Sequence, residues 1–300
     1  FFTYGVLGIF AGLIAGMFGI GGGLIIVPIL IASFIGSNFD GEIIVHLAIG
    51  TSMATIVFTG LASAYTHYKN KAVVNSYFKF ISYGIVFGAL TGALFTVQIP
   101  GEYVKKFIGI LIGLIVIQIF FDLKFRLTNN GPSQRLLVLS GSGIGFLSSI
   151  LGIGGGLFTV PYLKNIGLSL KKSIGTSSAC GIPIAIFGSL GYVILGLNEA
   201  KLPMLSFGYT YLPAVVGISI TSVFSARIGG NLAHFFSTNT LRNLMCILLI
   251  CIAFYMFSIC FQFAAANFHS VFGMFPIGAP CSQDGLGLQH DLKMFPKTVF

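Results

Sequence analysis

The sequence predicts an all-α integral membrane protein made of two homologous halves, each with four apolar segments. Three observations predict this class. Hydrophobic residues make up 55% of the 300 residues and charged residues only 8%, whereas soluble domains carry about 25% charged residues. Apolar runs of roughly 20 residues, long enough to span a hydrocarbon core, recur as far as residue 262. A glycine-rich motif near the start of the chain returns in the second half.

The duplicated motifs divide the chain into repeats. The run G-I-G-G-G-L at 19–24 recurs at 152–157, and each copy is followed three residues later by Val-Pro. A second block, I-G-T-S, occurs at 49–52 and at 174–177. The predicted parts are a first membrane repeat at 1–125, an inter-repeat loop at 126–135, a second membrane repeat at 136–262 and a C-terminal tail at 263–300. The tail has no sustained period, and we expect it to be poorly ordered or a non-native extension.

The apolar segments come in matching order in the two halves. In the first half they cover 4–36, 43–66, 77–97 and 104–121, and in the second half 136–167, 173–197, 203–224 and 240–262. Each opening segment is long for one span and short for two. The first glycine run divides its segment into pieces that are each about 20 Å long, so neither piece crosses a core of about 30 Å. We therefore expect both opening segments to be broken or re-entrant at the glycine run.

Loop charges indicate how the halves are oriented. The loop after the opening segment is acidic in the first half, with Asp40 and Glu42, and basic in the second, with Lys164, Lys171 and Lys172. By the positive-inside rule the halves then have opposite orientations, which requires an odd number of crossings in each half. A re-entrant segment followed by three spans gives such an inverted repeat. The alternative is eight full spans in two parallel repeats, with three lysines on the outside.

The glycine runs are the candidate binding site. Glycine costs a helix interior about 1 kcal/mol and proline about 3 kcal/mol, so the runs predict breaks. The main-chain N–H groups of a break, together with the positive end of the next helix, can bind an anion without a charged side chain. Hydroxyls of the I-G-T-S blocks add neutral donors. The candidate anion-binding residues are Gly19, Gly21, Gly22, Gly23, Thr51 and Ser52 in the first half and Gly152, Gly154, Gly155, Gly156, Thr176 and Ser177 in the second.

Packing is the alternative role for small residues in membrane helices. Glycines one turn apart allow close helix contact, and a serine or threonine in a span can bond back to its own helix. Three consecutive glycines do not have the one-turn spacing, so the binding interpretation is kept for the two runs. The residues assigned to packing are Gly8, Gly12 and Gly16 in the first half and Gly141, Gly145 and Ser149 in the second.

Other function classes find little support in the sequence. The net charge of +9 comes from Lys and Arg in short loops, as the positive-inside rule expects, so nucleic acid is not an expected partner. The five cysteines form no CxxC pattern, and we expect neither a metal site nor a cofactor. Leu24 and Leu157 stand where a dinucleotide fingerprint needs glycine. A membrane enzyme would need clustered catalytic side chains at mid-depth, which the segments lack, so no catalytic residue is assigned; a non-transporting scaffold or accessory subunit stays open.

At these motifs the sequence resembles the sulfite exporter TauE/SafE family of membrane transport proteins. The resemblance rests on G-x-G-G-G-x-x-x-V-P at 19–28 and 152–161, on the two I-G-T-S blocks, and on the stretch 226–243, and it covers about residues 3–262. It implies a multi-pass permease of the bacterial inner (plasma) membrane that moves sulfite, sulfonates or related sulfur-containing anions. The expected partners are a small anionic substrate and the lipid bilayer. The sequence gives no oligomeric state, transport direction or coupling ion.

Overall fold

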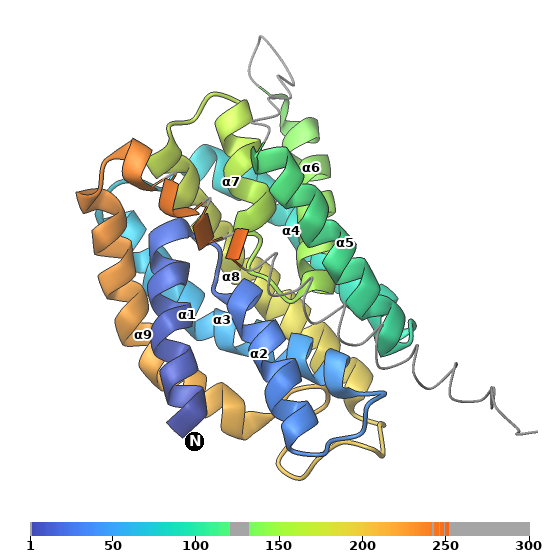
Figure 1. Ribbon diagram of the computed structural model, residues 1–300. Helices are drawn as coiled ribbons and strands as arrows, with labels where there is room; N and C mark the ends of the chain where they lie inside the picture. The colour runs from blue at the N-terminus through green and yellow to red at the C-terminus, as the bar shows by residue number, and fades with distance from the viewer. Residues whose placement is uncertain (1, 121–131, 242, 246, 249, 252–300) are drawn as a thin grey trace, which may run out of the picture. The chain divides into compact units, whose positions relative to one another are not determined.

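The computed structural model describes residues 2–120 and 132–251, apart from 242, 246 and 249, and gives only the main chain for 112–120 (Figure 1). The first half forms α1 (Phe2–Phe18), α2 (Gly23–Gly36), α3 (Ile44–Lys69), α4 (Asn75–Val97) and α5 (Gly101–Phe120). The second forms α6 (Gln134–Leu151), α7 (Gly156–Asn165), α8 (Leu170–Gly196), α9 (Leu212–Phe235) and a further helical stretch from 238. The predicted tail at 263–300 lies outside the described residues.

Each opening segment is broken at its glycine run, as predicted. We call residues 19–23 the first glycine run and residues 152–156 the second. The first run separates α1 from α2, and the second separates α6 from α7. Five described helices, α3, α4, α6, α8 and α9, are long and apolar enough to cross a membrane, whereas α1 and α2 are apolar but shorter. The chain is therefore a multi-pass helical membrane protein.

One predicted segment was placed wrongly. The hydropathy pattern predicts a span over 203–224, but α9 begins at Leu212 and continues to Phe235. Pro213 lies in the first turn of α9, where its fixed φ favours the start of a helix. The preceding stretch folds back on itself, because Leu205 and Gly208 have positive φ and a short bridge joins Ser206 to Tyr211.

The first helix of each half packs against the fourth helix of the other half. α1 lies along α9, and α6 lies along α4 (Figure 1). A Cβ atom on Gly12 would lie 2.4 Å from the carbonyl oxygen of Ser222, and one on Gly145 would lie 2.7 Å from that of Ile85. The main chains of the paired helices therefore touch, which confirms the predicted packing role of the glycines spaced one turn apart.

Replacing Gly141 with alanine is expected to destabilise the protein by about 1–3 kcal/mol, the usual cost of overpacking. The new Cβ would lie 2.2 Å from the carbonyl oxygen of Ile81 on α4. Thermal unfolding in detergent measures the effect. Gly143 is the matched control on the same helix, since nothing lies within 4 Å of its Cβ position. Equal midpoints for the two variants would contradict the close contact of α4 and α6.

An exposed ion cluster joins loops of the two halves. Lys201, in the loop after α8, donates a hydrogen bond to the Glu42 carboxylate and lies 3.7 Å from Asp40. The hydrogen bond to Glu42, together with the negative charge of Asp40, raises the pKa of Lys201. While the two carboxylates are charged, the cluster therefore stabilises the fold below the ordinary pKa range of lysine, and this contribution is lost as the pH rises through the raised pKa. Because all three side chains reach solvent, the contribution is small.

Candidate functional site

The two glycine runs cross each other in the interior of the described chain. A Cβ atom on Gly21 would lie 2.8 Å from the Cα atom of Gly154, and one on Gly23 would lie 2.1 Å from the carbonyl oxygen of Gly152. Three pairs meet in antiparallel order: Gly19 with Gly156, Gly21 with Gly154, and Gly23 with Gly152. The two equivalent segments therefore pass each other in opposite directions, with Gly21 against Gly154.

The backbone of both runs takes conformations that require glycine. Positive φ angles occur at Gly19 (67°), Gly21 (79°), Gly22 (77°), Gly152 (68°) and Gly155 (79°). Residues with a Cβ atom adopt such angles only with strain. Gly22 and Gly155 stand immediately before α2 and α7 with nearly identical angles, so the two runs fold alike. The predicted need for glycine at a positive φ is confirmed at these positions.

Several main-chain amides of the two runs have no partner within the described chain. No described residue accepts a hydrogen bond from the N–H of Gly21, Gly22, Gly23 or Leu24, or from that of Gly154, Gly155, Gly156 or Leu157. All eight residues are buried. An unpaired backbone group costs several kcal/mol in a membrane interior, so these amides can donate to an acceptor atom that is brought to them.

Two of the predicted glycines have other roles. The N–H of Gly19 donates to Ala15, and that of Gly152 donates to Ser149. The eight unpaired amides named above lie further along each run, at the N-termini of α2 and α7, where the positive end of the helix dipole also lies.

Two predicted hydroxyls hold the carbonyl groups at the start of the runs. Ser52 on α3 donates to the carbonyl oxygen of Gly152 at 2.8 Å, and Ser177 on α8 donates to that of Gly19 at 3.2 Å. Each serine therefore binds the glycine run of the opposite half and does not bond back to its own helix. In this arrangement both serine hydroxyls donate their protons to main-chain carbonyl groups and have no proton left to donate to an anion.

The other two predicted hydroxyls accept hydrogen bonds from main-chain amides. Thr51 accepts from the N–H of Tyr211 at 2.9 Å, and Thr176 accepts from that of Val74 at 3.0 Å. The start of α3 thus contacts the loop after α8, and the start of α8 contacts the loop after α3. The two equivalent helices run antiparallel, which is the relation that an inverted repeat needs.

Removing the Ser52 and Ser177 hydroxyls together is expected to lower the stability by about 2–4 kcal/mol, because two buried carbonyl groups lose their donors. The S52A/S177A variant and wild type are compared by thermal unfolding in detergent. Ser189→Ala is the control, since the Ser189 hydroxyl bonds only to Ile186 in its own helix. An unchanged midpoint for the double variant would show that these hydrogen bonds do not hold the runs.

Ile56, which no sequence motif indicates, covers the crossing point. Its side chain is fully buried, and its Cγ2 atom lies 3.1 Å from the Cβ positions of both Gly21 and Gly154. The equivalent position in the second half, 125 residues further on (174 − 49), is Gly181, so the covering side chain comes from the first half. An isoleucine in an apolar helix carries no signal that distinguishes it from its neighbours.

Ser148 was also missed. Its hydroxyl is buried, has no partner within the described residues, and lies 3.5 Å from the Cβ position of Gly155. The matching residue of the first half is Ala15. Comparing the two repeats position by position would have shown this additional hydroxyl beside the second run.

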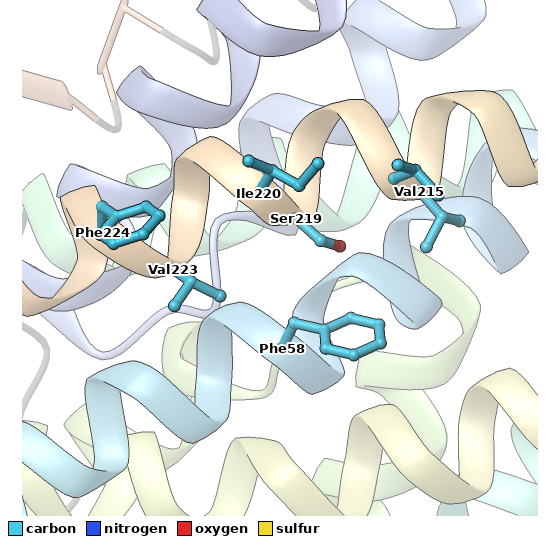
Figure 2. A pocket seen from close by; sticks show the side chains of 7 residues that line it. Phe58, Val215, Ser219, Ile220, Val223 and Phe224 are labelled. Carbon is cyan, nitrogen blue, oxygen red and sulfur yellow. The ribbon is translucent and has the colours of Figure 1, made fainter.

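A cavity of about 390 Å³ opens elsewhere, between α3 and α9 (Figure 2). Figure 2 shows Phe58 on α3 across from a row of side chains on α9. The residues that line the cavity are Phe58, Val215, Val216, Ser219, Ile220, Val223 and Phe224. Phe58, Ile220 and Phe224 are exposed, as side chains that face lipid would be. This cavity contains none of the predicted site residues.

The fold and the crossing define a class: a helical membrane protein whose two repeated opening segments break at one shared centre lined by neutral main-chain donors. Residues 4–256 match the family described as Sulfite exporter TauE/SafE. The chain belongs to that family, and it is a membrane transporter.

Relatives support this assignment along most of the chain. A protein of Haemophilus influenzae called a probable membrane transporter protein is 34% identical over 253 residues, which cover 84% of this chain and 96% of the relative. Probable membrane transporter proteins of Methanocaldococcus jannaschii and Bacillus subtilis are each 28% identical, over 80% and 71% of this chain and 89% and 86% of their own lengths. No solved structure was found that matches the chain.

Proposed function

We propose that the protein is a secondary transporter for small anions, namely sulfite, sulfonates or related organosulfur anions, in the cell inner (plasma) membrane. The anion is bound at mid-membrane by the main-chain amides of the two glycine runs. The observation that carries this proposal is the set of eight buried amides, those of Gly21–Leu24 and Gly154–Leu157, that have no acceptor among the described residues. The sulfur chemistry of the substrate follows from the family description.

The geometry supports weak and reversible binding. Oxyanion oxygens accept from the amides of Gly21–Gly23 in one run and Gly154–Gly156 in the other, and the dipoles of α2 and α7 favour the negative charge. Ser52 and Ser177 fix the turns that present these amides, and Thr51 and Thr176 fix the starts of α3 and α8. A site without a fixed positive charge releases its anion readily, as transport requires.

Alternating access follows from the crossing. Because Gly21 and Gly154 touch in the described arrangement, no anion passes between the two runs until the halves move apart. Two repeats of opposite orientation around one central axis are a recurrent transporter design, in which one half rocks against the other. Each run then serves as the binding surface that faces one side of the membrane.

Flux into proteoliposomes tests the proposal. Radiolabelled sulfite and radiolabelled methanesulfonate are added to liposomes that contain the full chain, with protein-free liposomes as the control. We expect saturable uptake of at least one of the two anions, and competition between them. Absence of flux for every sulfur oxyanion tested would reject the proposal and favour the non-transporting scaffold.

A further inference from the structure

Two histidines from different halves meet near one end of the described helices. His67, near the end of α3, places its Nδ1 atom 3.0 Å from the Nε2 atom of His234, near the end of α9. The ring centroids are 5.0 Å apart. The Nε2 atom of His67 lies 2.9 Å from the carbonyl oxygen of Gly16 on α1. We call His67 and His234 the histidine pair.

These contacts fix where the protons of the neutral pair lie. A carbonyl oxygen only accepts, so the Nε2 atom of His67 carries its hydrogen and donates to Gly16. The Nδ1 atom of neutral His67 is then a lone pair, which accepts the Nε2–H of His234. The Nδ1 atom of His234 has no hydrogen-bond partner among the described residues and is the open position for another proton.

The pair takes up one proton without losing a contact. Protonation of His234 at Nδ1 leaves its Nε2–H donating to His67, now as a stronger, charge-assisted hydrogen bond. A second proton on the Nδ1 atom of His67 would set two N–H groups face to face and two positive charges about 3 Å apart, which breaks the contact. His234 is partly exposed, whereas His67 is fully buried, so the proton enters through His234.

The charged surroundings favour release of this proton once the rings separate. Besides the two rings, the described group whose charge reaches the pair is Lys171 on α8, whose ammonium donates to the carbonyl oxygen of His234 at 2.8 Å. α1 contributes only the main-chain carbonyl of Gly16. With a neighbouring cation and no carboxylate among these groups, the proton is held mainly by the hydrogen bond between the rings.

The second half has the equivalent side-chain hydrogen bond to a carbonyl oxygen, but the donor is not a group that titrates near neutral pH. The residue equivalent to His67 is Tyr192, and its hydroxyl donates at 3.1 Å to the carbonyl oxygen of Ser149, the residue equivalent to Gly16. A phenol, with an ordinary pKa of about 10, keeps its proton at physiological pH, whereas an imidazole does not. The two ends of the helix pair α3 and α8 therefore differ in their response to protons.

We propose that the histidine pair is a proton-binding site that couples anion transport to the movement of one proton. The pair holds the proton while α1, α3 and α9 are arranged as described, and opening of this end separates the rings and releases it. Gly16 lies three residues before the first glycine run, so separation of the rings and movement of that run occur together. The coupling rests on the proposed transport function, but the proton site does not.

Ring-nitrogen NMR tests the proton site directly. The full chain, labelled with ¹⁵N-histidine in nanodiscs, is titrated from pH 8 to pH 5. The sequence has five histidines, and single His→Gln variants assign the signals. We expect His67 and His234 to change together in one step, and His67→Gln to remove the joint step. Two rings that stay neutral down to pH 5, or that titrate without affecting each other, would overturn the site.

Proteoliposomes test the coupling. The probe is methanesulfonate, whose charge is constant between pH 5 and pH 8, under an inwardly directed proton gradient. We expect wild type to accumulate the anion, and His67→Gln and His234→Gln to lose accumulation while they still exchange labelled for unlabelled anion. His46→Gln is the matched control, because His46 lies at the other end of α3, where its ring contacts the carbonyls of Thr96 and Ile99.

The outcomes separate the two proposals. Accumulation by both pair variants at the wild-type level would overturn the coupling and leave anion transport standing. Failure of wild type to move any sulfur oxyanion would reject the transport function and the coupling with it, while the NMR titration still decides the proton site. If either pair variant fails to fold, Lys171→Gln provides the second test, since Lys171 donates to the carbonyl oxygen of His234 and its removal is expected to change the pH of the joint NMR step. An unchanged step would overturn the proton site.

Discussion

Gly23→Ala is expected to destabilise the protein by more than about 3 kcal/mol and to abolish anion flux. The new methyl group would lie 2.1 Å from the carbonyl oxygen of Gly152 and 2.8 Å from the Cδ1 atom of Ile56. Both neighbours are buried at the crossing, and the nearer one is main chain, so the runs must move apart. Overpacking alone costs about 1–3 kcal/mol. Here the hydrogen bonds that Ser52 and Ser177 donate to the two runs are strained as well.

The control for this variant is Gly36→Ala, at the other end of α2. Nothing lies within 4 Å of the Cβ position of Gly36, and alanine favours a helix over glycine by up to about 1 kcal/mol. Thermal unfolding in detergent and sulfite flux are measured for both variants. If Gly23→Ala unfolds and transports like Gly36→Ala, the two glycine runs do not cross as described.

Ile56→Glu is expected to reduce anion flux to the protein-free level. Ile56 touches both glycine runs, so a glutamate there brings a tethered carboxylate to the unpaired amides and competes with the free anion. Tethering gives the carboxylate a high local concentration. The amides that stabilise a substrate would also stabilise this side chain, and we therefore expect the variant to fold.

Ile56→Gln is the control, because glutamine has nearly the same shape as glutamate and carries no charge. Size-exclusion chromatography in detergent checks the folded state, and proteoliposome flux gives the activity. Flux in the glutamate variant equal to that of the glutamine variant would contradict anion binding at the amides. Anion binding would also be contradicted if the glutamate variant fails to fold while the glutamine variant folds, because a site that binds anions stabilises a carboxylate.

The breaks of the opening segments were predictable because glycine runs affect the backbone directly. Nothing but a break explains consecutive glycines in an apolar segment, and the positive φ angles at Gly21, Gly22 and Gly155 agree. The packing glycines were also predictable, since one-turn spacing is visible in the sequence. The bounds of α9 were not, because hydropathy alone does not distinguish the folded-back stretch before Pro213 from a helix.

The arrangement of the site could not be read from one sequence. The pattern predicted donors at Ser52 and Ser177, but only the fold shows that these hydroxyls bind the main chain of the opposite half. Ile56 and His67 depend on contacts between residues far apart in the chain. A hydrogen bond between His67 and His234 joins positions 167 residues apart, and no local pattern indicates such a pair.

The contact between α1 and α9 has a consequence for biosynthesis. Among the described helices Phe2–Phe18 leaves the ribosome before the others, and its packing partner begins only at Leu212. At about 5–20 residues per second, translation takes roughly 10–40 s to reach that partner. During this time the glycine face of the newly inserted helix has no protein to cover it, so completion of the nascent chain limits assembly, and a membrane chaperone or insertase that shields this face would act before α9 is made.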